Sequence, residues 1–472
     1  MLYQTIVDYF IENIEKGSIL PGEKLPSLRK ISDRFDVSLS TAVEAYRKLE
    51  LFGYVEAKDR SGYSAKFPLS GQNALKPSKS FRSKTCEIEH IDEIIQLINQ
   101  TIDKDTAPFG VGTPSINKFP NKMINRYLIQ TIKHVPESNA SYIFGQGLEV
   151  LRRELCRYIR PVIGYTSPDN LIVTNGCLEA INIALSAECA SGDLVAIESP
   201  CYFGLLHAIH HHGLKAIEVK TDPNEGLDPE ALETLAKSKK IRALISTPTA
   251  QNPLGFTMSD KRKKEILSIC KKYNIRLIED DVYGDIYFGK KRPKSYKYFD
   301  KDNIVTYCSS FSKFLGPGLR LGWMIPAVER SQYVRQKLSL NLASPSLVQH
   351  TVSNILRNEN LSKIGESLAS YYQQNIQIYS NVLQSQLGEK ITLSRPSGSY
   401  FLWARVEGLD SNSAYQTAQK KKISFAPGTL FSADRQYENY LRINCAHEFD
   451  EKRNIDLISL SKLLDSHKRF TL

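Results

Sequence analysis

The sequence predicts an α/β protein in two parts: a large domain built on a mainly parallel sheet, preceded by a small helical domain that carries a β-hairpin. A chain of 472 residues is too long for one ordinary hydrophobic core. From residue 106 onward, short β-rich apolar runs alternate with helical stretches, which is typical of a layered α/β architecture. Residues 1–68 instead show helical periodicity followed by one hairpin pattern. We therefore expect domains at 1–68 and 106–472, joined by residues 69–105.

The composition is that of an ordinary globular protein, with 41% hydrophobic and 24% charged residues. No apolar run reaches the ~18 residues of a membrane span. Asp8, Glu12 and Glu15 interrupt the first apolar stretch, unlike a signal peptide. The eight cysteines form no C-x-x-C pair, and the histidine triplet at 210–212 has no acidic or cysteine cluster beside it. We expect a cytoplasmic protein with reduced thiols, no membrane association and no metal site.

The net charge of +11 does not by itself indicate a nucleic-acid partner, because residues 1–66 hold ten basic and ten acidic side chains. The segment that follows is locally basic through Lys76, Lys79, Arg82 and Lys84. Three basic runs, at 261–264, 290–292 and 420–422, are expected to be solvated faces, with a second DNA-contact surface as the alternative.

The small domain is predicted to contain three helices and a wing. Apolar residues recur every four positions at Leu2, Ile6, Phe10 and Ile14, which predicts the first helix. Gly17 is predicted to end it. Ser27 and Ser38 are predicted N-caps of the next two helices, because a short hydroxyl side chain accepts hydrogen bonds from free backbone amides. The third helix ends at Gly53 and carries Val43, Tyr46, Leu49 and Phe52. Residues 55–67, broken at 59–62, are predicted to form a two-stranded wing.

This order of elements is typical of a winged helix-turn-helix, whose third helix enters the DNA major groove with its N-terminal residues. The alternative is a small helical domain whose charged face is simply solvated. On the DNA-binding interpretation, seven side chains contact the duplex. Those expected to face base edges are Ser38, Ser40 and Thr41; those expected to reach phosphates are Arg29, Arg47 and Lys48; the one expected to enter a minor groove from the wing is Arg60.

Two motifs in this region resemble the GntR-family DNA-binding domain. They are Gly17-x4-Gly22-Glu23-Lys24-Leu25-Pro26-Ser27-x-Arg29 and Val37-Ser38-x-x-Thr41-x-x-x-Ala45-Tyr46-x-x-Leu49-Glu50-x-x-Gly53-Tyr54. One residue departs from the family pattern, since Leu39 stands where the family often has an arginine on the recognition helix. The resemblance therefore implies double-stranded DNA as a partner, but it does not carry over the family's operator preference.

Residues 69–105 combine a polar stretch rich in Pro and Gly with a short helical pattern. The polar stretch predicts a linker. The helical pattern is made by Ile88, Ile91, Ile94, Ile95 and Ile98. We expect this helix to dock on the large domain, and the alternative is that it only marks where that domain begins.

In the large domain, five apolar runs predict buried strands of a mainly parallel sheet: 171–174, 194–197, 243–246, 276–279 and 304–307. Residues 259–273 are predicted to form a helix between two of them. Ligands of such sheets bind at the carboxyl ends of the strands. Most of the polar residues that are candidates for ligand binding follow these runs, as that rule predicts.

Lys313 lies in the run Ser310-Phe311-Ser312-Lys313, which looks like the place where pyridoxal 5'-phosphate (PLP) is held as a Schiff base. PLP also needs an acid for its pyridine nitrogen, a phosphate cradle, a side chain that stacks on its ring and a donor to its phenolic oxygen. The candidates are Asp280 for the nitrogen; Gly176, Cys177, Ser310, Ser312 and Arg320 for the phosphate; Tyr202 for the ring; and Tyr283 and Asn252 for the phenolic oxygen. Arg442 is the candidate for the carboxylate of a substrate or effector.

These motifs occur in the order and spacing of the class I aminotransferases of fold type I, which residues 109–472 resemble. The matching motifs are Tyr142-x-x-Gly145-x-Gly147-Leu148, Asn175-Gly176-Cys177, Pro200-x-Tyr202, Asn252-Pro253-x-Gly255, Asp280-x-x-Tyr283, Ser310-x-x-Lys313, Gly318-Leu319-Arg320-Leu321-Gly322 and Arg442. The resemblance implies PLP as the cofactor and a homodimer in which Tyr142 reaches the phosphate of the neighbouring subunit. Cys177 departs from the hydroxyl residue common in these phosphate sites, which weakens one side-chain contact and leaves the backbone amides.

A GntR-type domain placed before such a core resembles the MocR subfamily of bacterial transcriptional regulators. The resemblance implies a regulator that binds DNA through its winged helix and senses a small amino compound by aldimine exchange at Lys313. A working PLP-dependent aminotransferase with an accessory DNA-binding domain is the main alternative. A DNA-binding protein with a cofactor-free core is the third possibility.

Overall fold

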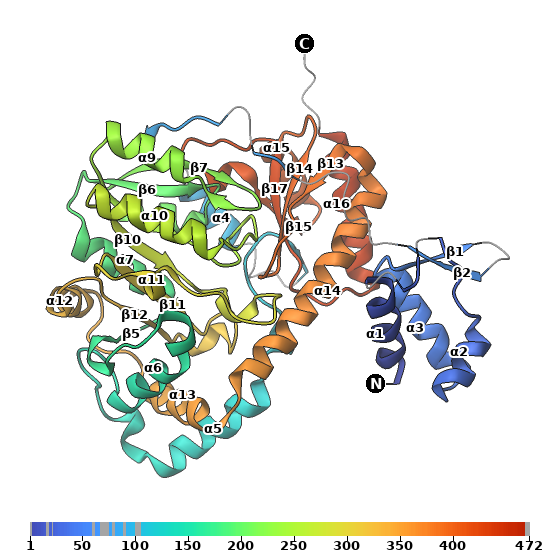
Figure 1. The fold of residues 1–472 in the computed structure, drawn as a ribbon, viewed down its shortest axis with the longest axis horizontal. Coiled ribbons are helices and arrows are strands. Elements are labelled where there is room, and N and C mark those ends of the chain that lie inside the picture. The colour runs from blue at the N-terminus through green and yellow to red at the C-terminus, as the bar shows by residue number, and fades with distance from the viewer. Residues whose placement is uncertain are drawn as a thin grey trace.

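The computed structural model describes residues 2–15, 18–20, 22–58, 62–66, 75–77, 81–87, 91–99 and 105–467. We call residues 2–66 the head, residues 75–99 the joint and residues 105–467 the body. The head lies to one side of the much larger body, and a long helix of the body runs toward it (Figure 1). Within these ranges, no helix is long and apolar enough to cross a membrane.

The head has the predicted order of elements, which are α1 (Leu2–Glu15), α2 (Leu28–Phe35), α3 (Leu39–Leu51), β1 (Val55–Lys58) and β2 (Gly62–Ala65). Both predicted N-caps are confirmed, because Ser27 Oγ accepts from Lys30 N and Ser38 Oγ accepts from Thr41 N. Val43, which the sequence grouped with the inward residues of α3, is 42% exposed, because it lies on the side of the helix away from the core. The predicted end of the first helix at Gly17 lies outside the described residues.

The head packs against α14 (Leu361–Leu387) of the body. Ile378 on α14 is 4% exposed and belongs to the same buried cluster as Ile6 and Tyr46 of the head. Gly53 has a φ of +76° and approaches α14 so closely that a Cβ there would lie 2.3 Å from Asn381 Nδ2. Ile378 therefore links a helix of the body to the core of the head.

The body is built on a sheet that has nine strands in the described part of the chain, in the order β3-β7-β6-β9-β10-β11-β12-β5, with β8 paired to β7. The strands are β3 (Thr85–Cys86), β5 (Ile172–Thr174), β6 (Leu194–Ser199), β7 (Lys215–Asp222), β8 (Gly226–Leu227), β9 (Ile241–Ser246), β10 (Arg276–Asp280), β11 (Val305–Ser310) and β12 (Gly322–Ile325). The pairs from β7 through β11 are parallel, whereas β12 is antiparallel to β11 and to β5. All five predicted strands and the mainly parallel sheet are confirmed.

Helices cover the sheet and connect its strands (Figure 1). They are α5 (Asn121–His134), α6 (Glu149–Ile163), α7 (Cys177–Glu188), α8 (Phe203–His211), α9 (Pro229–Ser238), α10 (Asp260–Lys272), α11 (Tyr296–Phe299), α12 (Arg330–Leu340), α13 (Ser346–Asn358), α15 (Ser411–Lys420) and α16 (Glu451–Ser466). The helix predicted at 259–273 is α10, and Ser259 caps it. The histidine triplet lies at the end of α8.

A second, antiparallel sheet in the C-terminal part of the body was not predicted. Its order is β13 (Ile391–Leu393), β14 (Phe401–Val406), β17 (Tyr440–Asn444) and β16 (Ala426–Pro427), and a separate parallel pair joins β4 (Ala107–Pro108) to β15 (Ile423–Ser424). Arg442 lies on β17, opposite Trp403 of β14. The second sheet thus carries one of the predicted ligand-binding side chains.

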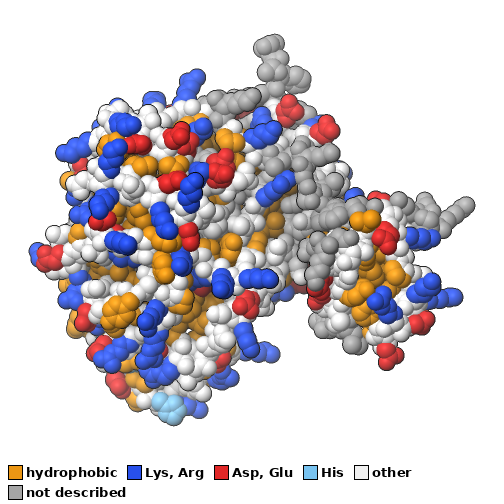
Figure 2. All heavy atoms as spheres, viewed as in Figure 1, with side chains coloured by type: hydrophobic (Ala, Val, Ile, Leu, Met, Phe, Trp, Pro, Cys, Tyr) orange, Lys and Arg blue, Asp and Glu red, His pale blue; other side chains and the backbone are white. Residues whose placement is uncertain are grey.

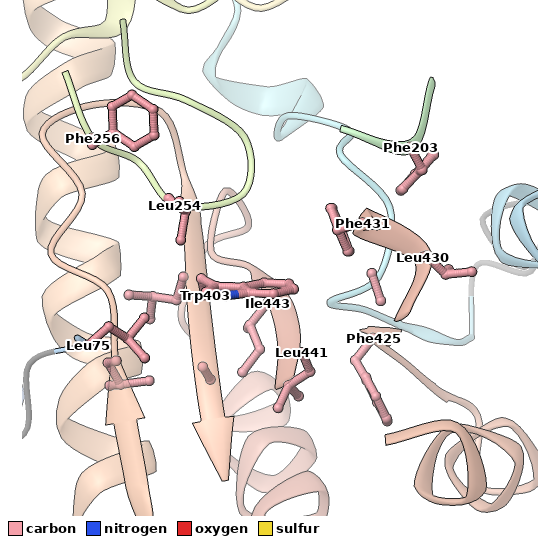
Figure 3. Close-up of a cluster of buried hydrophobic side chains, with 14 of the residues drawn as sticks. Leu75, Phe203, Leu254, Phe256, Trp403, Phe425, Leu430, Phe431, Leu441 and Ile443 are labelled. Carbon is pink, nitrogen blue, oxygen red and sulfur yellow. The ribbon is translucent and has the colours of Figure 1, made fainter. Parts of the chain in front are cut away.

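The joint packs on the body at three places. Strand β3 pairs antiparallel with β7 at the edge of the large sheet. Helix α4 (Ile91–Asn99) docks on the body, as expected, through Ile94 and Leu97, whereas Ile95 is 45% exposed. Leu75 belongs to the same buried cluster as Trp403 (Figure 3). The joint therefore attaches the chain to the body soon after the head ends.

Two basic runs expected to be solvated faces are partly buried instead. Lys263 is fully buried, and its Nζ donates to Lys294 O at 2.6 Å. Arg292 forms ion pairs with Asp281 at 2.6 Å and Asp285 at 2.8 Å. The expectation was wrong at these positions because the fold supplies Lys263 with a carbonyl acceptor and Arg292 with two acidic partners.

Candidate functional site

The candidate ligand-binding residues of the body meet at the carboxyl ends of its parallel strands. Gly176 follows β5, Tyr202 follows β6 and Asn252 follows β9, while Asp280 is the last residue of β10 and Lys313 follows β11. Parallel strands place their carboxyl ends along one edge of the sheet. The fold therefore brings together residues that are up to 137 positions apart, counted from 176 to 313.

Lys313 projects toward a backbone carbonyl in the segment before α5. Its Nζ donates to Gly112 O at 2.9 Å, and Tyr400 Oη donates to the same oxygen at 3.0 Å. Desolvation, together with the positive charge of Arg442, lowers the pKa of Lys313 to about 8. A larger fraction of this amine is consequently neutral near pH 7 than for an exposed lysine, and the neutral amine is the form that attacks an aldehyde.

Asp280 is a buried carboxylate, 6% exposed, whose partners are a thiol and an amide. Cys177 Sγ donates to Asp280 Oδ1 at 3.2 Å, and Val282 N donates to the same atom at 3.2 Å. Burial raises the pKa of Asp280 to about 6. A protonated pyridine nitrogen would supply the positive charge that this buried group needs, so Asp280 fits the role of the acid beneath PLP.

The cradle predicted for a phosphate forms where α7 begins. Gly176 has a φ of +108° and precedes the first residue of α7, Cys177. A Cβ at Gly176 would lie 2.8 Å from Arg320 Nη2, which donates to Asn175 O at 2.6 Å. The free amides at the start of α7 and the Arg320 guanidinium together suit an anion. The cradle therefore requires a residue without a side chain at position 176.

Two serines, one at the end of β11 and one just beyond it, are further candidates for the anion. Ser310 is 2% exposed and Ser312 is 9% exposed, and Ser310 Oγ accepts from Ser312 N at 3.4 Å. The Cys177 thiol donates to Asp280, so its side chain does not serve the phosphate site. Only the backbone amide of Cys177 is available to an anion there. Lys313, Asp280 and the donors near the start of α7 thus fit the aldehyde, the ring nitrogen and the phosphate of PLP.

Arg442 is fully buried on β17, and its hydrogen bonds to described residues use two of its five N–H groups. Its Nη1 donates to Asn252 Oδ1 at 3.0 Å and its Nη2 donates to Gly110 O at 2.5 Å. Its Nε has no hydrogen-bond partner among the residues described. Burial lowers the pKa of Arg442 to about 10, yet the group stays charged at pH 7. An unpaired buried N–H of a cation is the feature expected of a carboxylate-binding arginine.

Three aromatic rings surround the Arg442 guanidinium. Its central carbon lies 4.3 Å from the ring centre of Phe401, 5.0 Å from that of Phe431 and 5.6 Å from that of Phe203. Phe203 and Phe431 lie side by side, with ring centres 5.5 Å apart (Figure 3). The ring faces stabilise the cation and exclude water from it, which strengthens its attraction for an anionic ligand.

Asn252 links Arg442 to the tyrosine expected at the phenolic oxygen of PLP. Asn252 Nδ2 donates to Tyr283 Oη at 3.4 Å, and burial raises the pKa of Tyr283 so that its hydroxyl keeps its proton. Tyr202 is half-buried beside Phe203, with ring centres 4.8 Å apart. The structure therefore brings Tyr202, Asn252 and Tyr283 into the neighbourhood of Arg442 and Asp280, as the charge interactions among them also show.

The segment at 110–113 was missed by the sequence analysis, although it contacts several site residues through its carbonyl groups. Gly110 O accepts from Arg442, and Gly112 O accepts from Lys313 and Tyr400. The carbonyl groups of Val111 and Thr113 both accept from Asn444 Nδ2, at 2.6 and 2.9 Å. The two glycines were the available signal, because a Cβ at Gly112 would lie 3.1 Å from the Phe401 ring.

Tyr142 is the one candidate cofactor residue that the fold does not bring to Lys313 within this chain. Its side chain is 70% exposed and stacks on Phe144, with ring centres 5.4 Å apart and planes 27° apart. Phe144 is itself 58% exposed. The neighbouring-subunit role expected of Tyr142 therefore stays a prediction.

The DNA-contact candidates lie on the surface of the head. Ser38, Ser40, Arg29 and Arg47 are exposed, Thr41 and Lys48 are half-buried, and Arg60 lies outside the described residues. Ser38 Oγ lies 2.8 Å from both Ser40 Oγ and Thr41 Oγ1, so the first turn of α3 is held by hydroxyl contacts as well as by its cap. Figure 2 shows Lys and Arg side chains on the part of the head that faces away from the body.

Comparison with known families covers both parts of the chain. Residues 2–64 match the family "Bacterial regulatory proteins, gntR family", and residues 115–455 match "Aminotransferase class I and II". The HTH-type transcriptional regulator YjiR of Escherichia coli is 32% identical over 95% of this chain and 96% of its own length. The chain belongs to the MocR subfamily of GntR-type transcriptional regulators.

Solved structures agree with this assignment for the body of the MocR-type chain. The kynurenine aminotransferase of Pyrococcus horikoshii has a TM-score of 0.73 and 25% identity, and the match covers 82% of this chain and 96% of that one. The α-aminoadipate aminotransferase LysN of Thermus thermophilus has a TM-score of 0.72 and 26% identity, covering 79% and 94%. The predicted fold is thus confirmed: a winged helix-turn-helix precedes a fold-type-I aminotransferase domain.

Proposed function

We propose that this MocR-type protein is a PLP-dependent transcriptional regulator that binds double-stranded DNA through its head and senses a small amino compound at Lys313. The observation that carries the proposal is that α14 contacts the surroundings of Lys313 near one end and the head near the other (Figure 1). The family matches support the DNA-binding and aminotransferase-like parts. The contacts along α14 support the coupling between them.

The first half of α14 packs against the site. A Cβ at Gly365 would lie 2.6 Å from Asp285 O and 3.4 Å from the ring of Phe314, the residue after Lys313. Farther along, the ring centre of Tyr372 lies 5.0 Å from that of Tyr400. Because Tyr400 and Lys313 donate to the same carbonyl oxygen, a change at Lys313 alters the bonding of a side chain that rests on α14.

The second half of α14 packs against β17 and the head. Asn375 Nδ2 donates to Cys445 O at 2.9 Å and to His447 O at 2.8 Å, just beyond the strand that carries Arg442. One turn later Ile378 enters the head's buried cluster. Positions 372, 375 and 378 are three residues apart, so they share one face of the helix. A rigid helix with these contacts can couple the two sites energetically.

The residues of the site have separate tasks in this proposal. When bound, PLP supplies an aldehyde that takes up primary amines reversibly. Asp280 holds the ring nitrogen in its protonated form, while Gly176, Ser310, Ser312 and Arg320 hold the phosphate. If an amino compound took the place of Lys313 on PLP, the Lys313 amine would become free to take up a proton near the positive charge of Arg442. Such a change would alter the hydrogen bonds at Gly112 O and the packing of Tyr400, and would thereby shift the population of head arrangements.

A mixing experiment tests the sensing step. Amino acids and simple amines are added to the PLP-loaded protein while its visible absorbance and its affinity for a promoter fragment are recorded together. We expect both to change for an effector, and we expect Lys313→Ala to lose the visible band. Lys337→Ala is a matched control, because Lys337 is a buried lysine whose pKa burial also lowers to about 8 and which also donates to a glycine carbonyl, Gly145 O at 2.8 Å. A Lys313→Ala protein with an unchanged spectrum would refute the assignment of the lysine.

A deletion tests the DNA-binding step. Removing residues 1–68 should abolish specific promoter binding and leave the visible band in place. Retained promoter binding after this deletion would remove the head from the proposal. The family matches at 2–64 and 115–455 support domain boundaries at 1–68 and 106–472, with residues 69–105 joining them, and we propose a cytoplasmic location, where the DNA partner is found.

An active PLP-dependent aminotransferase is the second candidate function. It is favoured by Lys313, whose lowered pKa suits an amine that moves protons near pH 7, and by the aminotransferases among the structural relatives. Release of a keto acid in the mixing experiment, without any change in DNA affinity, would favour the enzyme. Turnover together with a DNA response would show that the chain does both.

We also propose that the protein is a homodimer in which Tyr142 contacts the neighbouring subunit. Exposed apolar side chains on α5 and before α6 support an interface there, since Tyr142 is 70%, Phe144 58%, Ile129 55% and Ile132 49% exposed. Light scattering on the purified protein should give twice the mass of the chain. Tyr142→Ala should weaken PLP retention without changing the head.

A further inference from the structure

Helix α3 exposes two apolar side chains that lie one turn apart. Leu39 is 48% and Val43 is 42% exposed, whereas Tyr46 and Leu49 on the other side of the helix are fully buried. A β-branched residue such as valine has a lower helix propensity than alanine, so an exposed Val43 does not serve the stability of α3. Leu39 and Val43 therefore form an apolar ridge, a term we keep for these two residues, that the folding of the head does not explain.

The first two turns of α3 contain none of the side chains that read guanine or adenine through paired hydrogen bonds. Residues 38–43 are Ser, Leu, Ser, Thr, Ala and Val, and arginine, lysine, asparagine and glutamine are missing from them. The three hydroxyl groups in this stretch bond to one another, since Ser38 Oγ lies 2.8 Å from Ser40 Oγ and from Thr41 Oγ1. Apart from these hydroxyl groups, the exposed side chains of residues 38–43 that can meet a base edge are those of the apolar ridge.

The charges around the apolar ridge favour DNA over another protein as its partner. Arg29 and Lys30 on α2 and Arg47 on α3 are exposed and lie on the same small domain. Basic side chains that flank the recognition helix fit the two phosphate backbones of a duplex. Between those backbones, the apolar groups of the major groove are the 5-methyl groups of thymine.

We propose that Leu39 and Val43 recognise thymine 5-methyl groups in the major groove, so that the operator carries A·T pairs opposite the first two turns of α3. The inference rests on DNA binding by the head, proposed above, and adds the class of base that the head selects. It gives Leu39 a positive role in recognition at a position where a guanidinium would instead select guanine.

The test begins with selection of a random-sequence duplex library on the full-length, PLP-loaded protein. Thymine should be enriched at two positions of each half-site. Replacing thymine by deoxyuridine at these positions removes only the methyl group, and should weaken binding about fourfold per site, the effect of about 0.8 kcal/mol for one buried methyl-sized group. Leu39→Ala should remove the response to one of the two replacements and Val43→Ala the response to the other.

Controls separate the possible outcomes. Leu20→Ala removes another exposed apolar side chain of the head, 61% exposed and outside α3, and should keep both responses to deoxyuridine. Leu39→Arg should shift the selected base at its position toward guanine. Equal affinity for thymine and deoxyuridine operators would overturn the inference while leaving DNA binding by the head intact. If Leu39→Ala and Val43→Ala change the oligomeric state in light scattering and leave base preference unchanged, the ridge is a protein interface and the inference is wrong. If the parent protein selects no sequence at all, the proposed regulator function fails as well.

Discussion

The reading surface of the head and the ligand site of the body are built in opposite ways. In the head, Ser38, Ser40 and Arg47 are exposed on one helix, and a local cap sets where that helix begins. In the body, Arg442 is fully buried and Asp280 is 6% exposed, and the site is assembled from the ends of five strands of the large sheet and from β17. Contacts close in sequence therefore position the DNA-reading residues, whereas long-range contacts position the ligand-binding residues. Substitutions in the body should consequently change stability and ligand response together. Substitutions in the head should change stability or DNA affinity without changing the response of the body to its ligand.

The largest expected effect comes from Arg442→Ala. Two hydrogen bonds between a guanidinium and a carboxylate contribute about 1.5–3 kcal/mol each. We expect an amino-acid effector to require at least roughly 100-fold higher concentration to change DNA affinity, since about 3 kcal/mol or more is lost. The response to a simple amine without a carboxylate should change far less. Arg405→Ala, an exposed arginine on the adjacent strand β14, is the control. Equal weakening toward amine and amino acid would exclude a carboxylate-binding role for Arg442.

Asp280→Asn should produce the next largest effect, and its sign depends on pH. Burial raises the pKa of Asp280 from its ordinary 3.8 to about 6, so ionisation of this group disfavours the folded state of the PLP-free protein. The penalty is absent below pH 4, grows as pH rises from about 4 to about 6 and is then constant at roughly 3 kcal/mol. The PLP-free Asp280→Asn variant should therefore unfold at higher urea than the parent at pH 8 and at the same urea at pH 4. PLP affinity should fall in the same variant, and a stability gain that persists at pH 4 would contradict this account.

Ile378→Ala should have a smaller effect, on the stability of the head and on the coupling of the head to the body. Ile378 is 4% exposed in the head's buried cluster, and removal of such a side chain costs about 2 kcal/mol or more. The head should become more sensitive to proteolysis, while the visible absorbance of the body stays unchanged. The change in DNA affinity that an effector produces should shrink toward none. Full retention of that change would show that α14 does not couple the two sites. Ile355→Val, a conservative change in α13 of the body, controls for general loss of stability.

The smallest expected effect is that of Ser38→Ala. Loss of an N-cap costs about 1 kcal/mol, and here the hydroxyl contacts to Ser40 and Thr41 are lost as well. The thermal unfolding of the head should shift to lower temperature, with the ligand response of the body unchanged. Ser27→Ala removes the matching cap of α2 and gives the comparison. A larger loss of DNA affinity for Ser38→Ala than for Ser27→Ala would show that Ser38 also contacts the duplex.

The sequence predicted those features that depend on neighbours in the chain. The caps at Ser27 and Ser38 follow from a hydroxyl residue before a helical pattern, and the structure has both. The five buried strands follow from apolar runs between helices. The site residues at their ends were also predictable, because polar residues after buried parallel strands face a common edge.

Features that depend on distant partners were not predictable. Lys263 belongs to a basic run in the sequence, yet it is buried and donates to Lys294 O, which is 31 positions away. The sequence predicts that Cys177 belongs to a phosphate site, yet its thiol donates to Asp280, which is 103 positions away. The hydrogen bonds at Gly112 likewise join segments that only the fold brings together. No local sequence pattern indicates these contacts, because the packing of the whole body determines each of them.

The short stretch at 110–113 has a practical consequence for anyone who wishes to study the ligand-binding half alone. The aminotransferase match begins at residue 115, and a truncation placed there would discard the carbonyl groups that hold Arg442, Asn444 and Lys313. Such a shortened protein would fold around an incomplete site and give misleading affinities. Cutting ahead of residue 105 keeps β4, its partner β15 and all four carbonyl groups in a single piece.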